Sequence, residues 1–182
     1  MISRPGIVAI ALLSLLGTAA CTGSDPDPVP AGGATTISVP ATPHIPCPAG
    51  SVPVDLSLPS DRSEVKLRVL NGTGVPDTAE FVGTGLAQFG YQVVETRDVV
   101  GAADFPEVAV LRFGPRAVGE AWLVKSNFPD PVRLEFDPQR EDDVVDVVVG
   151  RAFQFLSTTT EVNQAIAQAG QPTAPAGGCA QS

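Results

Sequence analysis

The chain has 182 residues, of which 43% are hydrophobic and 17% are charged, so it is long enough for one domain with a buried core. Eleven Lys and Arg residues stand against 20 Asp and Glu residues, which gives a net charge of −9. This balance argues against nucleic acid as a partner. It also argues against docking on anionic headgroups or phosphate-bearing wall polymers by charge alone, because such docking needs a basic patch.

Residues 1–20 have the layout of a secretory signal peptide. A positive charge at Arg4 precedes an apolar run from Gly6 to Leu16, and small residues follow. The apolar run is too short for a full membrane span. We therefore expect an extracytoplasmic protein at the outer face of the cell membrane.

Cys21 directly follows this signal, and the sequence "GTAAC" resembles the lipobox at which bacterial lipoproteins are lipidated on cysteine. Thr18 departs from that pattern, in which leucine is usual three residues before the cysteine. Two or more acyl chains hold a protein durably at a membrane, so we expect lipidated Cys21 to be the membrane anchor. Plain cleavage after Ala20 is the alternative.

The regions outside the folded domain are predicted from composition. Residues 21–60 are rich in proline and lack periodicity, which indicates an extended, disordered tether that starts at the lipidated cysteine. We place the folded domain at residues 61–170 and a C-terminal tail at residues 171–182.

Two further cysteines, Cys47 and Cys179, lie just outside the two ends of this domain. They form an even pair in an oxidising compartment. We predict an intramolecular disulfide between them, and pairing with a partner protein is the alternative.

The first β-α unit is predicted at residues 65–90. Val65, Leu67 and Val69 alternate with basic residues, as expected of a half-buried strand. Asp77 and Glu80 form a capping box, which predicts the start of a helix. Apolar residues spaced four, three, four and three apart then draw one stripe down a helix that ends before Gly90: Val75, Ala79, Val82, Leu86 and Phe89.

The later elements follow from the same patterns. We expect a second helix opening at Pro115 that buries Trp122 in the core, with a surface anchor as the alternative for Trp122, and a third helix with a capping box at Thr158 and Glu161. Four strands are predicted at residues 91–98, 107–113, 132–136 and 144–149, the last being central because it is apolar on both faces. The order β-α-β-β-α-β-β-α predicts a small single-sheet α/β sandwich with helices mainly on one face.

The turn formed by Asn71, Gly72, Thr73 and Gly74 is the candidate binding turn, because a glycine-rich strand-to-helix turn can cradle a phosphate. A dinucleotide fingerprint, however, needs a third glycine where Asp77 stands, and an acid near a helix N-terminus repels phosphate.

Glu95 stands where the ribose-binding acid of a dinucleotide site would, so the match with that fingerprint is partial. A Walker loop is excluded, because no G-K-[ST] follows the glycines. We expect the glycines to shape the backbone, and we expect no nucleotide or other cofactor.

Residues suited to catalysis are few. The single histidine, His44, lies in the tether, and the cysteines lack metal-ligand spacing, so we expect no catalytic site and no metal. Glu141, Asp142 and Asp143 lie together in one polar connection, which indicates a solvated loop. The alternative is an acid/base pair of a glycopolymer hydrolase or ligase.

Four motifs in order carry a family resemblance: "LRVLNGTG", "LAQFGYQVVE", "VLRFG" and "DDVVDVVVGRAF". From Arg62 to Phe155 the chain resembles the LytR C-terminal domain family, which carries V-x-N-G/A-S/T-G, G-[FY]-x-V and V-V-x-G-x-D-F. The layout around Cys47, "RFGPRAVGEAWLV" and Cys179 is more particularly similar to actinobacterial cell-envelope members. Ala152 departs from the family, which usually has Asp there.

This resemblance implies an extracytoplasmic α/β domain without catalytic activity that is tied to envelope maintenance. Such domains often stand beside or are appended to glycopolymer-attaching LytR-CpsA-Psr enzymes. We therefore predict a secreted, lipid-anchored, non-enzymatic protein that binds an envelope protein or a cell-wall component and supports envelope integrity.

Overall fold

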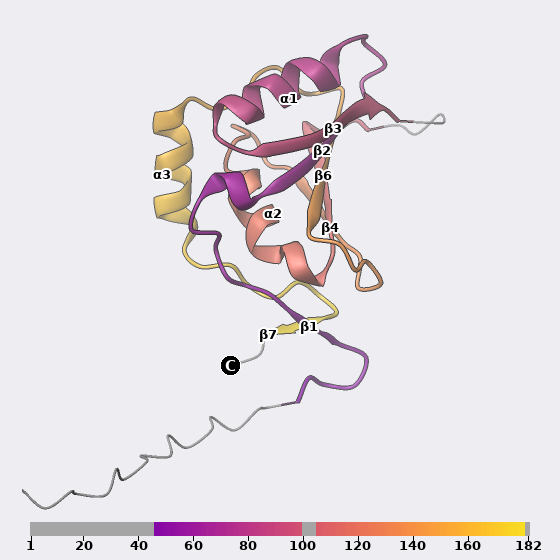
Figure 1. Cartoon of the computed structure of the whole chain (residues 1–182), viewed down its shortest axis with the longest axis vertical. Helices are drawn as coiled ribbons and strands as arrows, with labels where there is room; N and C mark the ends of the chain where they lie inside the picture. The colour runs from indigo at the N-terminus through magenta and orange to yellow at the C-terminus, as the bar shows by residue number, and fades with distance from the viewer. Residues whose placement is uncertain (1–45, 100–104, 181–182) are drawn as a thin grey trace, which may run out of the picture. The chain divides into compact units, whose positions relative to one another are not determined.

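The computed structural model describes residues 46–99 and 105–180 (Figure 1). The chain divides into two units, Met1–Pro40 and Ala41–Ser182, and all described residues belong to the second. The predicted signal peptide, Cys21 and His44 lie outside the described residues. Within residues 46–99 and 105–180, no helix has both the length and the apolar character that a membrane crossing requires.

A five-stranded sheet forms the centre of the domain, with the strand order β3-β2-β6-β4-β5. β2 pairs in parallel with β3 and β6, β4 is antiparallel to β6, and β5 is parallel to β4. As predicted from its apolar residues on both faces, β6 is the central strand. The strands are β2 (Lys66–Asn71), β3 (Gln92–Asp98), β4 (Ala109–Phe113), β5 (Arg133–Phe136) and β6 (Val144–Val149).

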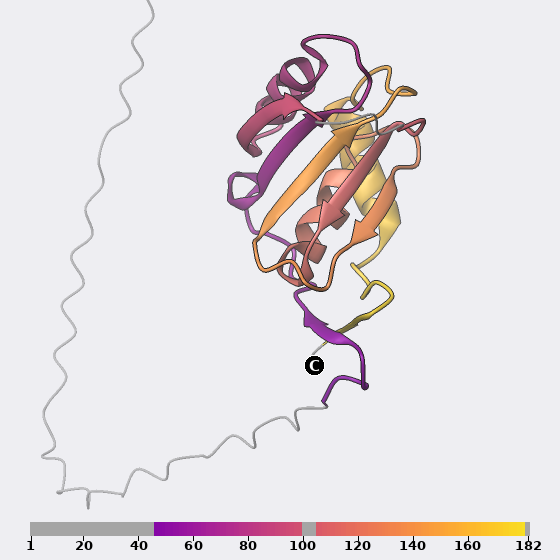
Figure 2. The ribbon, with the colours of Figure 1, turned by 90° about the vertical axis from the view of Figure 1, so that its right-hand side faces the viewer.

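Three α-helices pack against one face of this sheet, which confirms the predicted α/β class (Figures 1 and 2). Strand side chains such as Leu67 and Val147 alternate toward these helices and meet Leu86 in a core where all three are fully buried. Each such burial stabilises the fold by about 1.5 to 3 kcal/mol. Trp122 is also a core residue, 7% exposed. The helices are α1 (Thr78–Gln88), α2 (Val118–Lys125) and α3 (Thr159–Ala169), with 3-10 turns η1 (Arg62–Glu64) and η2 (Pro115–Ala117).

The start of α1 differs from its prediction. Asp77 has a left-handed backbone with φ of 61°, and its side chain makes no capping hydrogen bond, so the predicted capping box with Glu80 is wrong. Thr78 Oγ1 instead donates to the carbonyl of Val75 at 2.8 Å. Val75 lies in the turn before the helix and is 61% exposed, so it is not part of the buried stripe. The capping box of α3, by contrast, is formed by Thr158 and Glu161 as predicted.

A second, two-stranded sheet lies in segments that the sequence assigned to the tether and the tail. β1 (Val52–Val54) and β7 (Gly178–Ala180) pair in parallel, and a disulfide joins Cys47 to Cys179, whose Cα atoms are 5.8 Å apart. The assignment of a disordered tether through residue 60 is therefore corrected for the described part. The strands were missed because three residues among prolines carry no readable periodicity.

The chain after β1 is held against α2. The amide of Asp55 donates to the carbonyl of Pro115 at 2.8 Å. A Cβ on Gly119 would lie 2.0 Å from the carbonyl oxygen of Ser57, so the two backbones approach as closely as only glycine allows. The folded domain consequently begins before residue 61.

Candidate functional site

The turn between β2 and α1 is organised by the buried side chain of Asn71, which is 6% exposed. Its amide nitrogen Nδ2 donates to the carbonyl of Val75 and to Asp98 Oδ1, both at 2.8 Å. Its oxygen Oδ1 accepts from the amide nitrogen of Thr73 at 3.0 Å and from Thr73 Oγ1 at 2.7 Å. One side chain therefore fixes the turn from the end of the strand to the start of the helix.

The two glycines of this turn serve its geometry. Gly74 has φ of +77°, a region that favours glycine. Gly72 donates its amide to the carbonyl of Val149 at 2.9 Å, and an added Cβ would lie 2.6 Å from a ring carbon of Phe105. Gly72 is thus needed for space and Gly74 for backbone conformation.

Two amides of the turn are engaged within it and are not available to a phosphate. Thr73 donates to Asn71 Oδ1, and Val75 donates to Thr73 Oγ1 at 2.9 Å. Asp77 stands at the N-terminus of α1, where a carboxylate opposes a bound anion. The geometry therefore supports a structural role for the four turn residues that the sequence singled out.

The acidic loop between β5 and β6 is ion-paired. Asp142 accepts two hydrogen bonds from Arg140, and Asp143 accepts one from Lys66 Nζ at 2.8 Å. These hydrogen bonds lower the pKa of both carboxyl groups. A glycosidase general acid needs the opposite shift, because it must hold its proton near neutral pH. The shifts of Asp142 and Asp143 are therefore opposite to the shift that the hydrolase alternative requires of its general acid.

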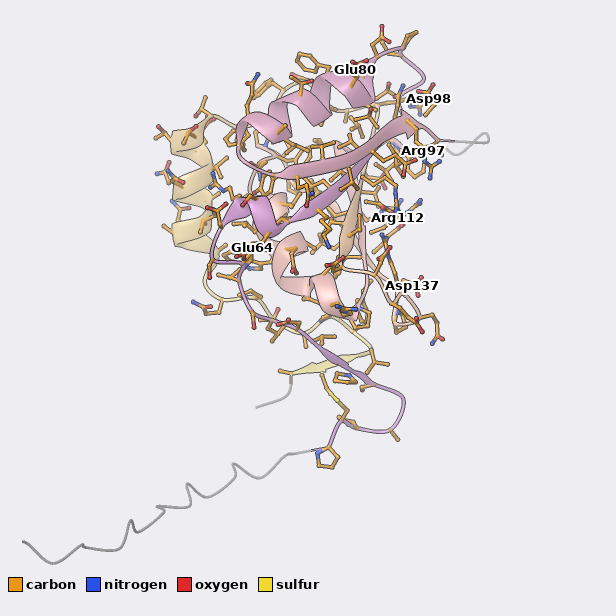
Figure 3. All side chains as sticks on the ribbon, in the orientation of Figure 1. Glu64, Glu80, Arg97, Asp98, Arg112 and Asp137 are labelled. Atoms are coloured by element: carbon orange, nitrogen blue, oxygen red, sulfur yellow. A yellow bond between two sulfur atoms is a disulfide. The ribbon has the colours of Figure 1, made fainter. Side chains whose placement is uncertain are left out.

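The face of the sheet away from the helices, which is turned toward the viewer in Figure 2, is here called the open face. It carries a network of charges. Arg140 donates to both oxygens of Asp146 at 3.0 and 3.1 Å, and Arg68 bridges Asp146 to Glu95. Figure 3 shows Arg97 and Arg112 on this same side. Further ion pairs join Lys66 to Asp143, Arg112 to Glu135, and Arg133 to both Glu107 and Glu135.

A groove lies on the other side of the domain, between α1 and the connection from β6 to α3. It consists of two hollows of about 700 and 390 Å³ that share Asp77 and Phe81. Three large apolar side chains on its walls are exposed: Val75 (61%), Phe81 (68%) and Phe155 (55%). We call this the α1 groove. Contiguous exposed apolar surface of this kind marks binding sites on proteins.

The α1 groove is shaped by close packing at Gly85. A Cβ there would lie 2.7 Å from Leu156 Cδ1, so the connection reaches α1 because that position has no side chain. Ser157 then fixes the connection, since its amide donates to the carbonyl of Asn127 at 2.9 Å. The groove walls are held by these contacts.

Sequence reasoning missed the α1 groove. Phe81 lies between the buried Ala79 and Val82 on α1 but does not belong to the apolar stripe. A phenylalanine off the stripe of an amphipathic helix is a signal that could have been noticed. Phe155 could not have been paired with it, because the contact between their segments is tertiary.

Two remaining features of the sequence concern metal ligands and Ala152, which stands where the family resembled usually has Asp. In residues 46–99 and 105–180, no three Asp, Glu, Cys or His side chains are grouped so as to hold a metal ion. Ala152 is exposed, and its amide donates to the carbonyl of Glu107 at 3.3 Å.

Comparison with known proteins gives one family and one structure. A crystal structure of the soluble domain of a conserved hypothetical secreted protein from Mycobacterium marinum is similar, with 25% sequence identity and a TM-score of 0.47. The similarity covers 67% of this chain and 81% of that chain. No curated protein matches the sequence. Residues 64–153 match the model of the family LytR_C, described as LytR cell envelope-related transcriptional attenuator.

Proposed function

We propose that this is a secreted, lipid-anchored, non-enzymatic protein of the cell envelope whose domain binds an envelope protein or a cell-wall component. The LytR_C match fits a cell-envelope protein, and that family is generally non-catalytic. The layout around Cys47 and Cys179 also resembles the actinobacterial cell envelope integrity protein Cei. That likeness supports a role in envelope integrity.

The α1 groove is the observation that carries the binding function. Phe81 is 68% exposed and Phe155 55% exposed, although burying such rings against a partner is worth several kcal/mol. Aromatic side chains at the centre of an interface supply much of the binding energy of protein complexes. The open face, in contrast, has its charges engaged in internal ion pairs.

Photocross-linking in living cells tests this binding. A photoreactive residue replaces Gln88, which lines the α1 groove, and a matched control replaces Gln139, which is exposed on the loop after β5. We expect an adduct at position 88 that Phe81→Ser removes, and no adduct at position 139. The absence of an adduct at position 88, or equal adducts at both positions, would contradict the proposal.

The anchor is tested separately at Cys21. Two or more acyl chains give durable membrane attachment, so Cys21→Ala should release the protein to the medium or leave an unprocessed precursor. Metabolic labelling with a fatty-acid analogue reports lipidation directly. A wild-type protein that incorporates no label would overturn the anchor.

The non-enzymatic character is tested on purified cell-wall material. We expect no released product from the wild type. Product release that is lost when Glu141, Asp142 and Asp143 are changed together to amides would instead establish a glycopolymer-acting enzyme.

A further inference from the structure

We propose that the α1 groove binds a polypeptide segment in which an apolar side chain is flanked by Lys or Arg. This inference rests on the proposed binding function and adds the chemistry of the partner. It follows from two features that the same groove combines: exposed aromatic walls and carboxylates that have no partner in the part of the chain that the structure describes.

The apolar part of the groove would take the apolar side chain. Phe81 and Phe155 face solvent over most of their surface, and the larger hollow between their segments, about 700 Å³, has room for a large side chain and adjacent backbone. Because Gly85 lets the connection pack on α1, the groove exists without a rearrangement. A preformed apolar pocket loses little free energy to ordering when it binds.

The carboxylates of the groove would take the flanking cations. Asp77 lines both hollows and Glu80 lines the larger one. Neither side chain makes a hydrogen bond or an ion pair within the described residues. On the open face, Glu95 and Asp146 are each paired with arginine.

The backbone conformation of Asp77 also distinguishes the groove from the open face. Asp77 is the one non-glycine residue with positive φ among the described residues, a conformation that costs free energy. The conformation yields no helix cap in return. It does place a carboxylate beside the exposed ring of Phe81, within the lining of both hollows.

Other occupants fit less well. An anionic lipid or wall phosphate would be repelled by the two carboxylates and by the net charge of −9. A wholly apolar partner would cover these carboxylates without compensating them. Arg151 lines the smaller hollow, so two acids stand against one base in the groove as a whole. A cationic and apolar segment complements both features at once.

Binding of designed peptides to the full chain tests the inference. Three fluorescent peptides of equal length present leucine flanked by lysine, leucine flanked by glutamate, and serine flanked by lysine. Fluorescence anisotropy should show that the lysine-leucine peptide binds roughly tenfold or more tightly than either of the others. Its affinity should also fall as salt is raised, because the charges are exposed.

Variants locate the binding site. Phe81→Ser should weaken the lysine-leucine peptide at least tenfold, and the double variant Asp77→Asn/Glu80→Gln at least several-fold. The double variant Asp130→Asn/Glu141→Gln removes the same charge from exposed positions outside the groove and should leave binding unchanged. Equal effects of the two double variants would show non-specific attraction and would overturn the inference, as would equal binding of all three peptides or of none.

Failure of the peptide experiment can be distinguished from failure of the proposed binding function. Cross-linking at position 88 together with peptides that do not discriminate would retain the binding function and remove the inferred partner chemistry. A missing adduct at position 88 would remove the binding function itself.

Discussion

The disulfide between Cys47 and Cys179 should supply a large share of the stability of the domain. It joins residues that are 132 positions apart and so encloses the whole five-stranded sheet in one covalent loop. Cys179 lies within β7, and β1 and β7 contribute only three residues each. A strand pair of that length is not stable by itself, so we expect the covalent link to keep the two ends together.

The chain-entropy relation gives the magnitude. For a loop closed over a separation of 132 residues, the restricted entropy of the unfolded chain corresponds to about 5 kcal/mol at 25 °C. For a domain of this size, each kcal/mol shifts the melting temperature by about 3 °C, so removal of the bond should lower it by up to about 15 °C.

Urea unfolding of the wild type, Cys47→Ser, Cys179→Ser and the double variant measures this effect. All three variants should lose the same free energy of unfolding, and reductant should lower the wild type to their level while leaving them unchanged. Additive losses in the double variant, or a wild type that does not respond to reductant, would refute the reasoning. A free thiol at either position in non-reducing peptide mapping would refute it directly.

Three further predictions concern the turn, a half-buried acid and the open face. Gly74→Ala should cost about 1 to 2 kcal/mol in urea unfolding, because its φ is +77°. Gly72→Ala should cost more, because its methyl group would meet a packed ring and a backbone carbonyl, and the reverse order would contradict these roles. Burial raises the pKa of Glu120, so stability should fall as pH rises from below its unfolded pKa through the raised folded value. Glu120→Gln should therefore stabilise the protein at pH 7 and have little effect below pH of about 4, whereas a gain that is equal at both pH values would exclude this cause. Asp146→Asn should cost about 1 to 3 kcal/mol because two partly buried arginines lose their shared partner. Asp143→Asn should cost less than about 1 kcal/mol because its ion pair is 41% exposed on both sides, and equal costs would show that burial does not set the strength of these pairs.

The sheet and its covering helices could be predicted from the sequence because their side-chain periods are unambiguous. Leu67 and Val69 alternate with charged neighbours, and the run from Val144 to Val149 is apolar on both faces. Hydrophobic burial decides such elements locally, so the predicted strands and the central position of β6 agree with the structure.

The start of α1 could not be predicted, because the sequence offers a capping box at Asp77 and does not show that Asn71 fixes the turn instead. Asp77 followed by Glu80 has the spacing of a capping box, but the buried Asn71 already fixes the turn before it. With Asp77 in the left-handed region, its side chain cannot reach the amide that it would cap. A tertiary hydrogen-bond network therefore overrides a local signal.

The α1 groove was beyond prediction for a different reason. Its walls come from α1 and from the connection after β6, and Gly85 leaves room for Leu156 where they meet. A single sequence shows that Phe81 lies off the apolar stripe, but it does not show which distant segment lies beside it. Surface sites built from two segments depend on contacts that local patterns do not encode.

The open face and the α1 groove differ in what they leave available to a partner. On the open face, Arg68 and Arg140 both hold Asp146, and a partner that displaced these pairs would first have to break them. In the groove, Phe81 is exposed to water, and the carboxylate of Asp77 beside it has no partner among residues 46–99 and 105–180. Contact with a cationic and apolar segment would bury the ring and neutralise the carboxylate without breaking an existing bond. We therefore expect a partner to gain more free energy at the groove than at the open face, although the open face carries more charge.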